Sequence, residues 1–195
     1  MTSPLSAPNA PWSTARAPIL VLGGAYAGKS ELAISALAPD KSAVVLGTAA
    51  PRETAFAARL QQLKALRPPV WESIDCGRDL AAAIDEAAGR TAQILVDSIS
   101  QWLAGLLVEG TVQPGHEPAR ADSLTAQVTE VLQVVAAHPA VRFVFVSAEV
   151  GGGPPPARPL ERLYRQQLGL ANQRLAAVAK TVYWVTAGLP LALKE

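Results

Sequence analysis

The feature that most limits what this chain can fold into is a glycine-bearing turn near its start. An apolar run, Ile19 to Leu22, leads directly into Gly23 to Ser30, which reads Gly-Gly-Ala-Tyr-Ala-Gly-Lys-Ser, and a helical pattern continues from Lys29 to Leu37. Glycines at both ends of such a turn let the backbone amides point inward, and the start of a helix adds the positive end of its dipole. Strand, glycine turn, Lys-Ser and helix, in this order, predict a phosphate-binding loop. A turn that merely joins a strand to a helix is the alternative.

The residue types in this loop indicate phosphoryl chemistry. In loops of this kind the lysine ammonium contacts the β- and γ-phosphates, and the serine hydroxyl is a ligand of Mg²⁺, which assigns these roles to Lys29 and Ser30. A second ligand is expected from a carboxylate that follows a neighbouring strand, and Asp97 follows such an apolar run. Because Asp is also a favoured helix cap, Asp97 has a purely structural alternative. We expect Lys29, Ser30 and Asp97 to form the catalytic group, with Mg²⁺ as cofactor and ATP or GTP as substrate.

Short apolar runs alternate with longer helical patterns along the chain. This is typical of an α/β protein with a mainly parallel sheet and helices on both faces, as in P-loop NTPases. We expect one nucleotide-binding domain over residues 18–195, after a flexible tail over residues 1–17. Gly110 to Pro118 and Gly151 to Pro159 are predicted loops. The expected strands are Ile19 to Leu22, Ala43 to Gly47, Gln93 to Val96, Val141 to Ser147 and Val182 to Thr186, and the expected helices are Lys29 to Leu37, Glu53 to Leu66, Arg78 to Ala88, Ala121 to Ala137 and Leu160 to Ala179.

Composition excludes several classes of protein. With 17 basic and 16 acidic residues, the formal net charge of +1 offers no field for collecting nucleic-acid phosphates. The single cysteine, Cys76, cannot form an internal disulfide, and two isolated histidines, His116 and His138, do not make a Cys/His metal cage. The start lacks a signal-peptide pattern, and no apolar run approaches the ~20 residues of a membrane span. We expect a soluble, cytoplasmic protein without a nucleic-acid partner.

Further blocks of sequence follow the loop in order. They read GTAAPRETAFAARLQQLKALRPPVWESID over residues 47–75, ILVDSISQWLAGLL over 94–107, VFVSAEVGGGPPP over 144–156, and RLYRQQLGLANQRLAAVAKTVYWVTAGLPLALK over 162–194. With the loop, these blocks resemble the bifunctional adenosylcobinamide kinase / adenosylcobinamide-phosphate guanylyltransferase family of cobalamin biosynthesis. The resemblance covers nearly the whole chain, which makes it far more specific than a phosphate loop alone.

The resemblance implies a reaction in two stages. The family first phosphorylates the aminopropanol hydroxyl of adenosylcobinamide with a nucleoside triphosphate. It then takes GMP from GTP onto a histidine and passes it to the new phosphate. The family also assembles as homo-oligomers, which the apolar stretch Ser98 to Leu107 fits, although an ordinary buried helix explains that stretch equally well. The resemblance assigns to the nucleotide Gly23, Gly24, Ala25, Tyr26, Ala27, Gly28, Lys29, Ser30, Thr48, Ala49, Ala50, Lys64, Ala65, Leu66, Arg67, Asp75 and Asp97.

Some of these assignments have structural alternatives that the sequence leaves open. Arg67 precedes a proline and is alternatively a solvated turn residue. Trp71, in the same block, is alternatively a core aromatic, and Asp75 the cap of a helix that begins near Arg78.

Leucine occupies the position of the family's nucleotide-accepting histidine. Counting on from Arg59 leads to Leu63, and Arg67 then follows at the family's spacing, so the alignment is in register. A leucine has no lone pair, so it cannot attack the α-phosphorus of GTP. Neither His116, in a Gly/Pro loop, nor His138, at a helix end, lies in a segment that would replace it.

Other departures also exchange polar groups for apolar or differently charged ones. We therefore predict an adenosylcobinamide kinase-like enzyme without the guanylyltransferase step. A non-catalytic nucleotide-binding protein, or a phosphate-loop NTPase with another small substrate, are the alternatives. The departures are Tyr26 and Ala27 for Arg-Ser, Ala55 for Glu, Gly105 and Ala148 for Asn, and Lys180 for Asp.

Overall fold

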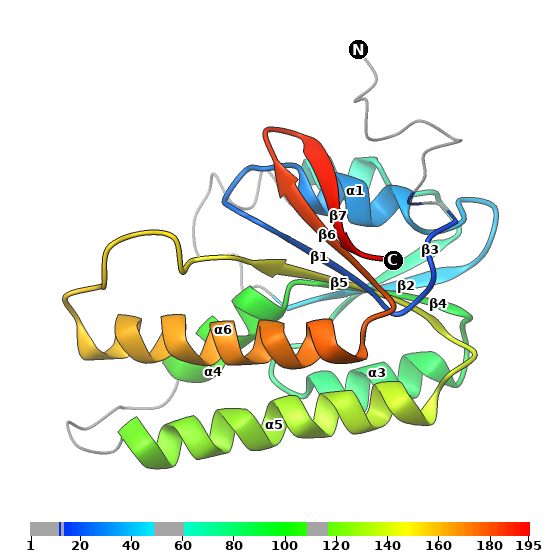
Figure 1. Ribbon diagram of the computed structural model, residues 1–195. Helices are drawn as coiled ribbons and strands as arrows, with labels where there is room; N and C mark the ends of the chain where they lie inside the picture. Colours follow the sequence, from blue (N-terminus) through cyan, green and yellow to red (C-terminus); the bar gives the residue numbers. More distant parts are fainter. Residues whose placement is uncertain (1–11, 13, 49–60, 109–116) are drawn as a thin grey trace.

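The computed structural model describes residues 12, 14–48, 61–108 and 117–195. In this part of the chain a seven-stranded sheet has the order β3-β2-β4-β5-β1-β6-β7 (Figure 1). Strands β1 to β6 pair in parallel, and β7 pairs antiparallel with β6. The strands are β1 Ile19–Gly23, β2 Ala43–Gly47, β3 Trp71–Asp75, β4 Gln93–Asp97, β5 Arg142–Ala148, β6 Thr181–Thr186 and β7 Leu189–Lys194.

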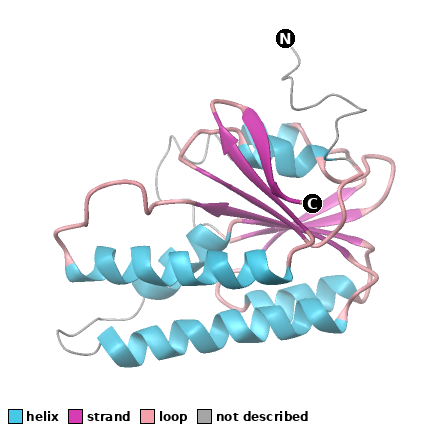
Figure 2. Cartoon of the chain, viewed as in Figure 1, coloured by secondary structure: helices cyan, strands magenta, loops and turns pink. Residues whose placement is uncertain are grey.

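Helices cover both faces of this sheet, which confirms the predicted α/β fold of the P-loop NTPase type. Figure 2 shows α1 on one side of the strands and the remaining labelled helices of Figure 1 on the other. Strand β1 feeds both layers, because Leu20 and Leu22 pack into the larger core and Ile19 and Val21 into the one beneath α1. The helices are α1 Lys29–Ser35, α3 Leu80–Ala88, α4 Ile99–Val108, α5 Glu117–Ala137 and α6 Pro159–Val178.

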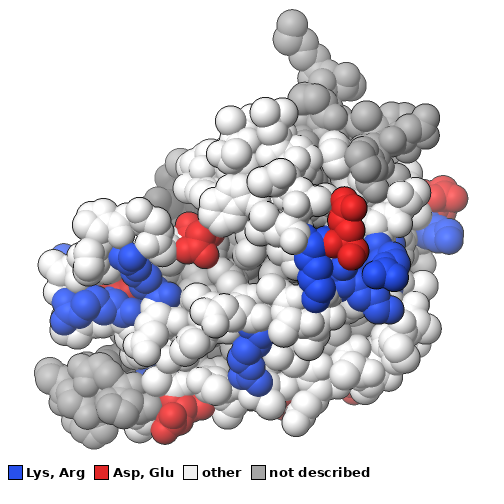
Figure 3. Space-filling model, in the orientation of Figure 1, with Lys and Arg blue, Asp and Glu red and all other residues white. Residues whose placement is uncertain are grey.

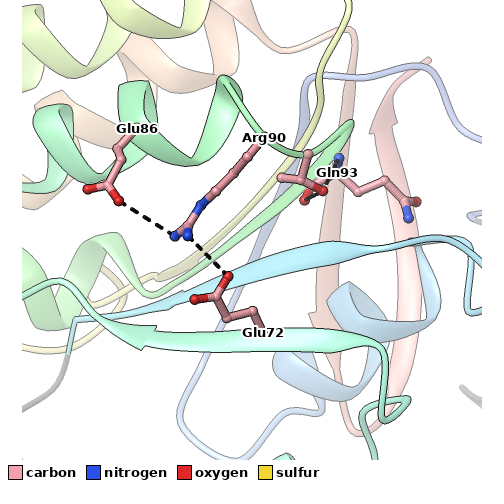
Figure 4. A network of polar contacts seen from close by, with 5 residues as sticks. Glu72, Glu86, Arg90 and Gln93 are labelled. Carbon is pink, nitrogen blue, oxygen red and sulfur yellow. Dashed lines mark hydrogen bonds and ion pairs between the residues drawn. The ribbon is translucent and has the colours of Figure 1, made fainter.

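Two strands and one helix lie outside the predicted set. Strand β3 is an edge strand that pairs only with β2, and its exposed Glu72 and Ser73 interrupt the apolar run that would have identified it. Arg90 ties this strand to α3 through Glu72 at 3.5 Å and Glu86 at 3.8 Å (Figure 4). Strand β7 contains a proline, which argues against a strand in sequence analysis. Residues 99–108 form α4. Most of its large apolar side chains are buried, so an ordinary buried helix accounts for the apolar stretch Ser98 to Leu107.

Several predicted boundaries are also wrong. Helix α5 begins at Glu117 rather than Ala121, so the predicted loop that ends at Pro118 overlaps the helix. Helix α6 begins at Pro159, because proline fits the first turn of a helix, where its missing N–H has no intrahelical partner. Helix α3 begins at Leu80 instead of Arg78. Of the predicted helix Glu53 to Leu66, residues 61–65 are helical and residues 53–60 lie outside the described part.

Residues 12 and 14–17, within the predicted tail, make contacts with the rest of the chain. Trp12 is buried, and its indole N–H donates to Ser35 Oγ at 2.6 Å. The Arg142 guanidinium donates to the Ala15 carbonyl at 2.8 Å, and Thr181 Oγ1 donates to the Arg16 carbonyl at 2.9 Å. In the described ranges, a search for a helix long and apolar enough to span a bilayer finds none.

Candidate nucleotide site

The glycine turn has the backbone of a phosphate loop. Gly23 has φ +154°, and a Cβ there would lie 2.2 Å from the Val185 carbonyl oxygen of the neighbouring strand. Gly28 is the N-cap of α1 in a left-handed conformation, with φ +99°. These two positions therefore require glycine, one for close packing and one for backbone angle. The turn also holds Tyr26 at φ +56°, which is uncommon for a residue with a side chain.

Lys29 lies over this loop. Its Nζ donates to the Gly24 carbonyl at 2.5 Å, five residues back along the chain. Ala27 N donates to the same carbonyl at 3.4 Å, so Gly24 is the point around which the turn closes. The ammonium thus lies over the glycine turn, and contact with phosphate stays its predicted role.

Neighbouring segments brace the loop from both sides. Glu149 N, just after β5, donates to the Gly23 carbonyl at 3.1 Å, and Gly188 N, in the turn between β6 and β7, donates to the Ala27 carbonyl at 2.9 Å. The first of these segments is itself held by buried Asn172 of α6, which accepts from Ser147 Oγ at 2.6 Å and donates to the Ala148 carbonyl at 3.0 Å. The turn is therefore anchored by strands on each flank rather than free to reshape.

Asp97 ends β4, which is separated from β1 only by β5. Its Oδ1 accepts a hydrogen bond from Ser30 Oγ at 3.3 Å. Burial raises the pKa of Asp97 above its ordinary value, while the hydrogen bond from Ser30 and the charges of Arg67 and Lys29 oppose this rise. The two adjacent oxygen donors suit a hard cation such as Mg²⁺, which takes few protein ligands and otherwise uses water and nucleotide oxygens.

Asp97 is not the cap of the helix after it, so that alternative is wrong. Ser98 Oγ accepts from Gln101 N at 3.3 Å and therefore caps α4, leaving the carboxylate of Asp97 facing Ser30. The Asp97–Ser98 peptide bond is cis. Thr48 holds this segment, since its Oγ1 donates to the Ser98 carbonyl at 2.7 Å and accepts from Ser98 N at 2.9 Å. The hydroxyl of Thr48 is thus occupied by the backbone beside Asp97.

A small pocket of about 20 Å³ adjoins Asp97. Four of the predicted nucleotide residues line it, although they come from separate segments of the chain. Ala65 and exposed Leu66 are not among its lining residues, and Ala49 and Ala50 lie outside the described part. The lining residues are Val45, Gly47, Lys64, Arg67, Ser73, Ile74, Asp75 and Asp97.

Arg67 is the central cation of this pocket. Its Nη1 donates to Ser73 Oγ at 2.9 Å, and its Nε is buried with no hydrogen-bond partner among the described residues. Burial lowers the pKa of Arg67, while the charges of Asp97 and Asp75 oppose this change. Arg67 is therefore a half-buried turn residue rather than a fully solvated one. A buried N–H without a partner suits a bound acceptor, such as a phosphate or carbonyl oxygen.

The structure also decides between the alternatives for Asp75 and Trp71. Asp75 ends β3 and lines the pocket, and the N-cap of α3 is Asp79, so the helix-cap alternative for Asp75 is wrong. Trp71 is a buried core aromatic whose indole N–H donates to the Lys41 carbonyl at 3.0 Å, as the structural alternative states.

Leu63 belongs to the hydrophobic core. It is 5% exposed and packs in the cluster beneath α1 that also contains Leu37 and Trp71. Its neighbour Lys64 lines the pocket, so the same short helix presents different faces to the core and to the site. His138 lies just after α5, and its Nε2 is 2.7 Å from Asp85 Oδ1 of α3. His116 lies outside the described residues.

Sequence reasoning missed several residues that shape the site. Ser73, Ser98 and Asn172 carry no motif of their own, because their roles depend on partners far along the chain. A metal cluster is also not found: in the described ranges no group of three or more His, Cys, Asp or Glu side chains is placed to hold an ion. Any Mg²⁺ at Ser30 and Asp97 would depend on the nucleotide and water for its remaining ligands.

Comparison with known proteins gives consistent results over nearly the full length. The family described as "Cobinamide kinase / cobinamide phosphate guanyltransferase" matches residues 19–193. The bifunctional adenosylcobalamin biosynthesis protein CobP of Pseudomonas aeruginosa is 32% identical over 176 residues, which is 90% of this chain and 96% of that protein. CobU of Salmonella typhimurium, described in the same words, is 31% identical over 182 residues, covering 90% and 99%. A solved type III secretion system ATPase is 14% identical with a TM-score of 0.49, covering 89% of this chain and 57% of that one.

Proposed function

The chain belongs to the cobinamide kinase / cobinamide phosphate guanyltransferase family, and we propose that it performs the kinase reaction without the guanylyltransferase reaction. One contrast carries this proposal. Ser30 Oγ lies 3.3 Å from Asp97 in the manner phosphoryl transfer needs, whereas the position of the family nucleophile holds Leu63, which is 5% exposed. The side chains expected for the kinase reaction are present, whereas the guanylyltransferase reaction lacks the nitrogen atom that would form the covalent bond to GMP.

The kinase reaction transfers the γ-phosphoryl group of ATP or GTP to the free hydroxyl of adenosylcobinamide. The hydroxyl oxygen forms the new bond to phosphorus, the bond to the β–γ bridging oxygen breaks, and the hydroxyl proton is released. The products are a nucleoside diphosphate and adenosylcobinamide phosphate. No bond to the protein is needed, since catalysis here consists of positioning and charge stabilisation.

Each group in the loop has a defined part in that transfer. The inward amides of Gly23 to Gly28 cradle the phosphates, and Lys29 neutralises negative charge that moves onto the leaving oxygen. Ser30 and Asp97 would hold Mg²⁺, which supplies further charge neutralisation when bound. Glu149 N and Gly188 N hold the loop from either side, so it binds phosphate without reorganising.

The pocket beside Asp97 suits the nucleoside end of the triphosphate. Lys64 and Arg67 offer cationic donors, and the Asp75 carboxylate accepts hydrogen bonds from amino groups such as those of guanine. The buried Nε of Arg67, which has no partner among the described residues, is the observation that favours a bound polar ligand at this place. With its phosphates on the loop and its nucleoside in the pocket, the bound triphosphate would pass beside Asp97.

The guanylyltransferase reaction requires a nucleophile that this chain does not offer at the family position. A side chain without a lone pair cannot form a phosphoramidate with GMP, and Leu63 faces the core rather than the pocket. His138 follows α5 and precedes β5, so it lies at the amino edge of the sheet, opposite the loop. It is therefore not placed to substitute.

The test uses two radiolabels. Purified protein is incubated with adenosylcobinamide and either GTP labelled at the α-phosphate or ATP or GTP labelled at the γ-phosphate, with Lys29→Ala as the blank. We expect label on the corrinoid from the γ position only. Covalent α-label on the protein would overturn the loss of guanylyl transfer. Triphosphate binding without transfer from either position would favour a non-catalytic nucleotide-binding protein.

A further inference from the structure

The turn between β6 and β7 carries large apolar side chains in solvent. Leu189 is 66% exposed and Leu191 is 59% exposed, at alternate positions of β7. Tyr26, on the phosphate loop itself, is 80% exposed. We call these three residues the hairpin surface. Single exposed leucines are common, but adjacent exposed apolar groups at the rim of a site indicate contact with a ligand or partner.

This surface is attached directly to the phosphate loop. Gly188 N donates to the Ala27 carbonyl at 2.9 Å, and each of these two residues is next in sequence to a member of the hairpin surface. Ala187 and Gly188 have φ of 49° and 77°, the positive values of a tight two-residue hairpin turn. Figure 1 shows this turn at the same end of the sheet as the loop after β1. The surface is therefore held beside the phosphate loop.

The two flanks of the loop differ in chemistry. On the Asp97 side lies the pocket with Lys64, Arg67 and Asp75. On the other side, the stretches 22–28 and 186–193 contain no charged residue. Figure 3 shows uncharged surface over the turn end of β6 and β7. A charged or strongly polar ligand suits the first flank, and a ligand with uncharged, carbon-rich faces suits the second.

We propose that the hairpin surface binds the corrin ring of the acceptor. The inference rests on the proposed kinase function, in which the triphosphate occupies the loop and the polar pocket. That arrangement leaves the hairpin flank as the side from which an alcohol reaches the γ-phosphate. A corrin is a large macrocycle that carries methyl groups and neutral amides, so its faces match apolar side chains better than charged ones.

A second copy of the chain is a poorer occupant. Pro190 lies between the two exposed leucines and has no N–H, and proline on an edge strand opposes pairing with another strand. Lys194, further along β7, donates to the carbonyls of Ala176 and Ala177 at the end of α6. The outer end of β7 is thus tied to α6 of its own chain, which opposes strand pairing with a second copy at this edge.

The test measures adenosylcobinamide binding by equilibrium dialysis, read from the visible absorption of the corrinoid, in the presence of a non-hydrolysable triphosphate. Leu189→Asn and Leu191→Asn should each weaken binding about tenfold, since each removes burial worth that factor. Leu170→Asn is the matched control, because Leu170 is 42% exposed on α6 and outside the surface.

The outcomes separate the two proposals. Weakened corrinoid binding in Leu189→Asn and Leu191→Asn, with triphosphate affinity unchanged, supports the surface even if no phosphoryl transfer is detected. The proposed corrin-binding role of the surface is overturned if the wild-type protein binds no adenosylcobinamide. It is also overturned if the hairpin variants bind adenosylcobinamide as well as Leu170→Asn does, and in that case phosphoryl transfer can still occur. A loss of triphosphate affinity in Leu189→Asn would assign the surface to the nucleobase. A lower mass in sedimentation would assign it to contact between copies.

Discussion

The phosphate loop and the helix over residues 61–65 contribute to the same site in opposite ways. In the proposed function the loop presents backbone amides, Lys29 and Ser30 to the nucleotide, and its glycine positions are fixed by close packing and backbone angle. The helix presents Lys64 to the pocket but packs Leu63 into the core. The difference teaches that a framework can keep the geometry of one reaction while it lacks the reactive atom of another. The predictions below test each side of this contrast.

The largest effect is expected from the backbone of the loop. Gly23→Ala would place a Cβ 2.2 Å from the Val185 carbonyl and force an unfavourable φ, which should cost about 3–5 kcal/mol of unfolding free energy. Gly24→Ala is the matched control, because nothing lies within 4 Å of its Cβ, and about 1 kcal/mol or less is expected. Urea unfolding of both variants measures this. Equal stabilities would contradict the packing requirement.

Lys29→Ala tests the charge that the loop offers to phosphate. We expect γ-phosphoryl transfer to adenosylcobinamide to fall about 10²–10³-fold, the usual loss when one charge-stabilising group is removed. Lys180→Ala changes an exposed lysine between α6 and β6 and should leave the rate within about twofold. A Lys29→Ala rate close to wild type would show that transfer does not depend on this loop.

Leu63→His places the family's histidine in the helix over residues 61–65 and so tests the guanylyltransferase reaction. Because Leu63 is buried, an imidazole there should cost about 2–4 kcal/mol of unfolding free energy, and no covalent label from α-labelled GTP is expected. Leu66→His, at a position 56% exposed, should cost less than about 0.5 kcal/mol. Covalent labelling of Leu63→His would show that the helix can turn this position toward the nucleotide.

Ser73→Ala tests how the pocket holds its cation. The change removes the oxygen that accepts from Arg67 Nη1 at 2.9 Å, so GTP should bind up to about fivefold more weakly, the value of one hydrogen bond. Ser42→Ala, at an exposed position that does not line the pocket, is the control. Unchanged affinity would mean that Arg67 keeps its position without Ser73.

The last prediction concerns the reactivity of Cys76, which follows Asp75 beside the pocket. Burial raises the pKa of the Cys76 thiol to about 11, and its Sγ donates to the Gly47 carbonyl at 3.4 Å. Since the thiolate is the reactive form, a raised pKa leaves less of it at pH 8, and alkylation should be about tenfold slower than in urea-unfolded protein. The chain has one cysteine, so the reaction reports this site alone. Equal rates would contradict the burial.

Much of the fold followed from apolar patterns in the sequence. The buried runs of β1, β2, β4, β5 and β6 are short and bounded by turn residues, and all were predicted within a few residues. Strands β3 and β7 were not, because β3 is an edge strand with exposed polar residues and β7 contains proline. Edge strands bury only part of their surface, so their sequences have no continuous apolar run.

Some residues of the candidate site could be predicted from the sequence and others could not. A local motif was sufficient to assign roles to Lys29 and Ser30, because these roles depend on neighbours in the same turn, and they stay predictions. The role of Asp97 needed the structure, because a cap and a loop-facing carboxylate look alike in sequence, and Ser98 turned out to be the cap. Asn172 could not be predicted, since its hydrogen bonds reach back to Ser147 and Ala148.

The sequence by itself determined the phosphate loop and the absence of a nucleophile at residue 63. Both are local facts, because a glycine turn depends on consecutive residues and a leucine has no lone pair in any fold. Only the tertiary structure decided that Lys64, Arg67, Asp75 and Asp97 share one pocket, and that an uncharged hairpin turn lies against the loop. The physical reason is that strand order brings together segments far apart in the chain, and that order depends on the packing of the whole sheet.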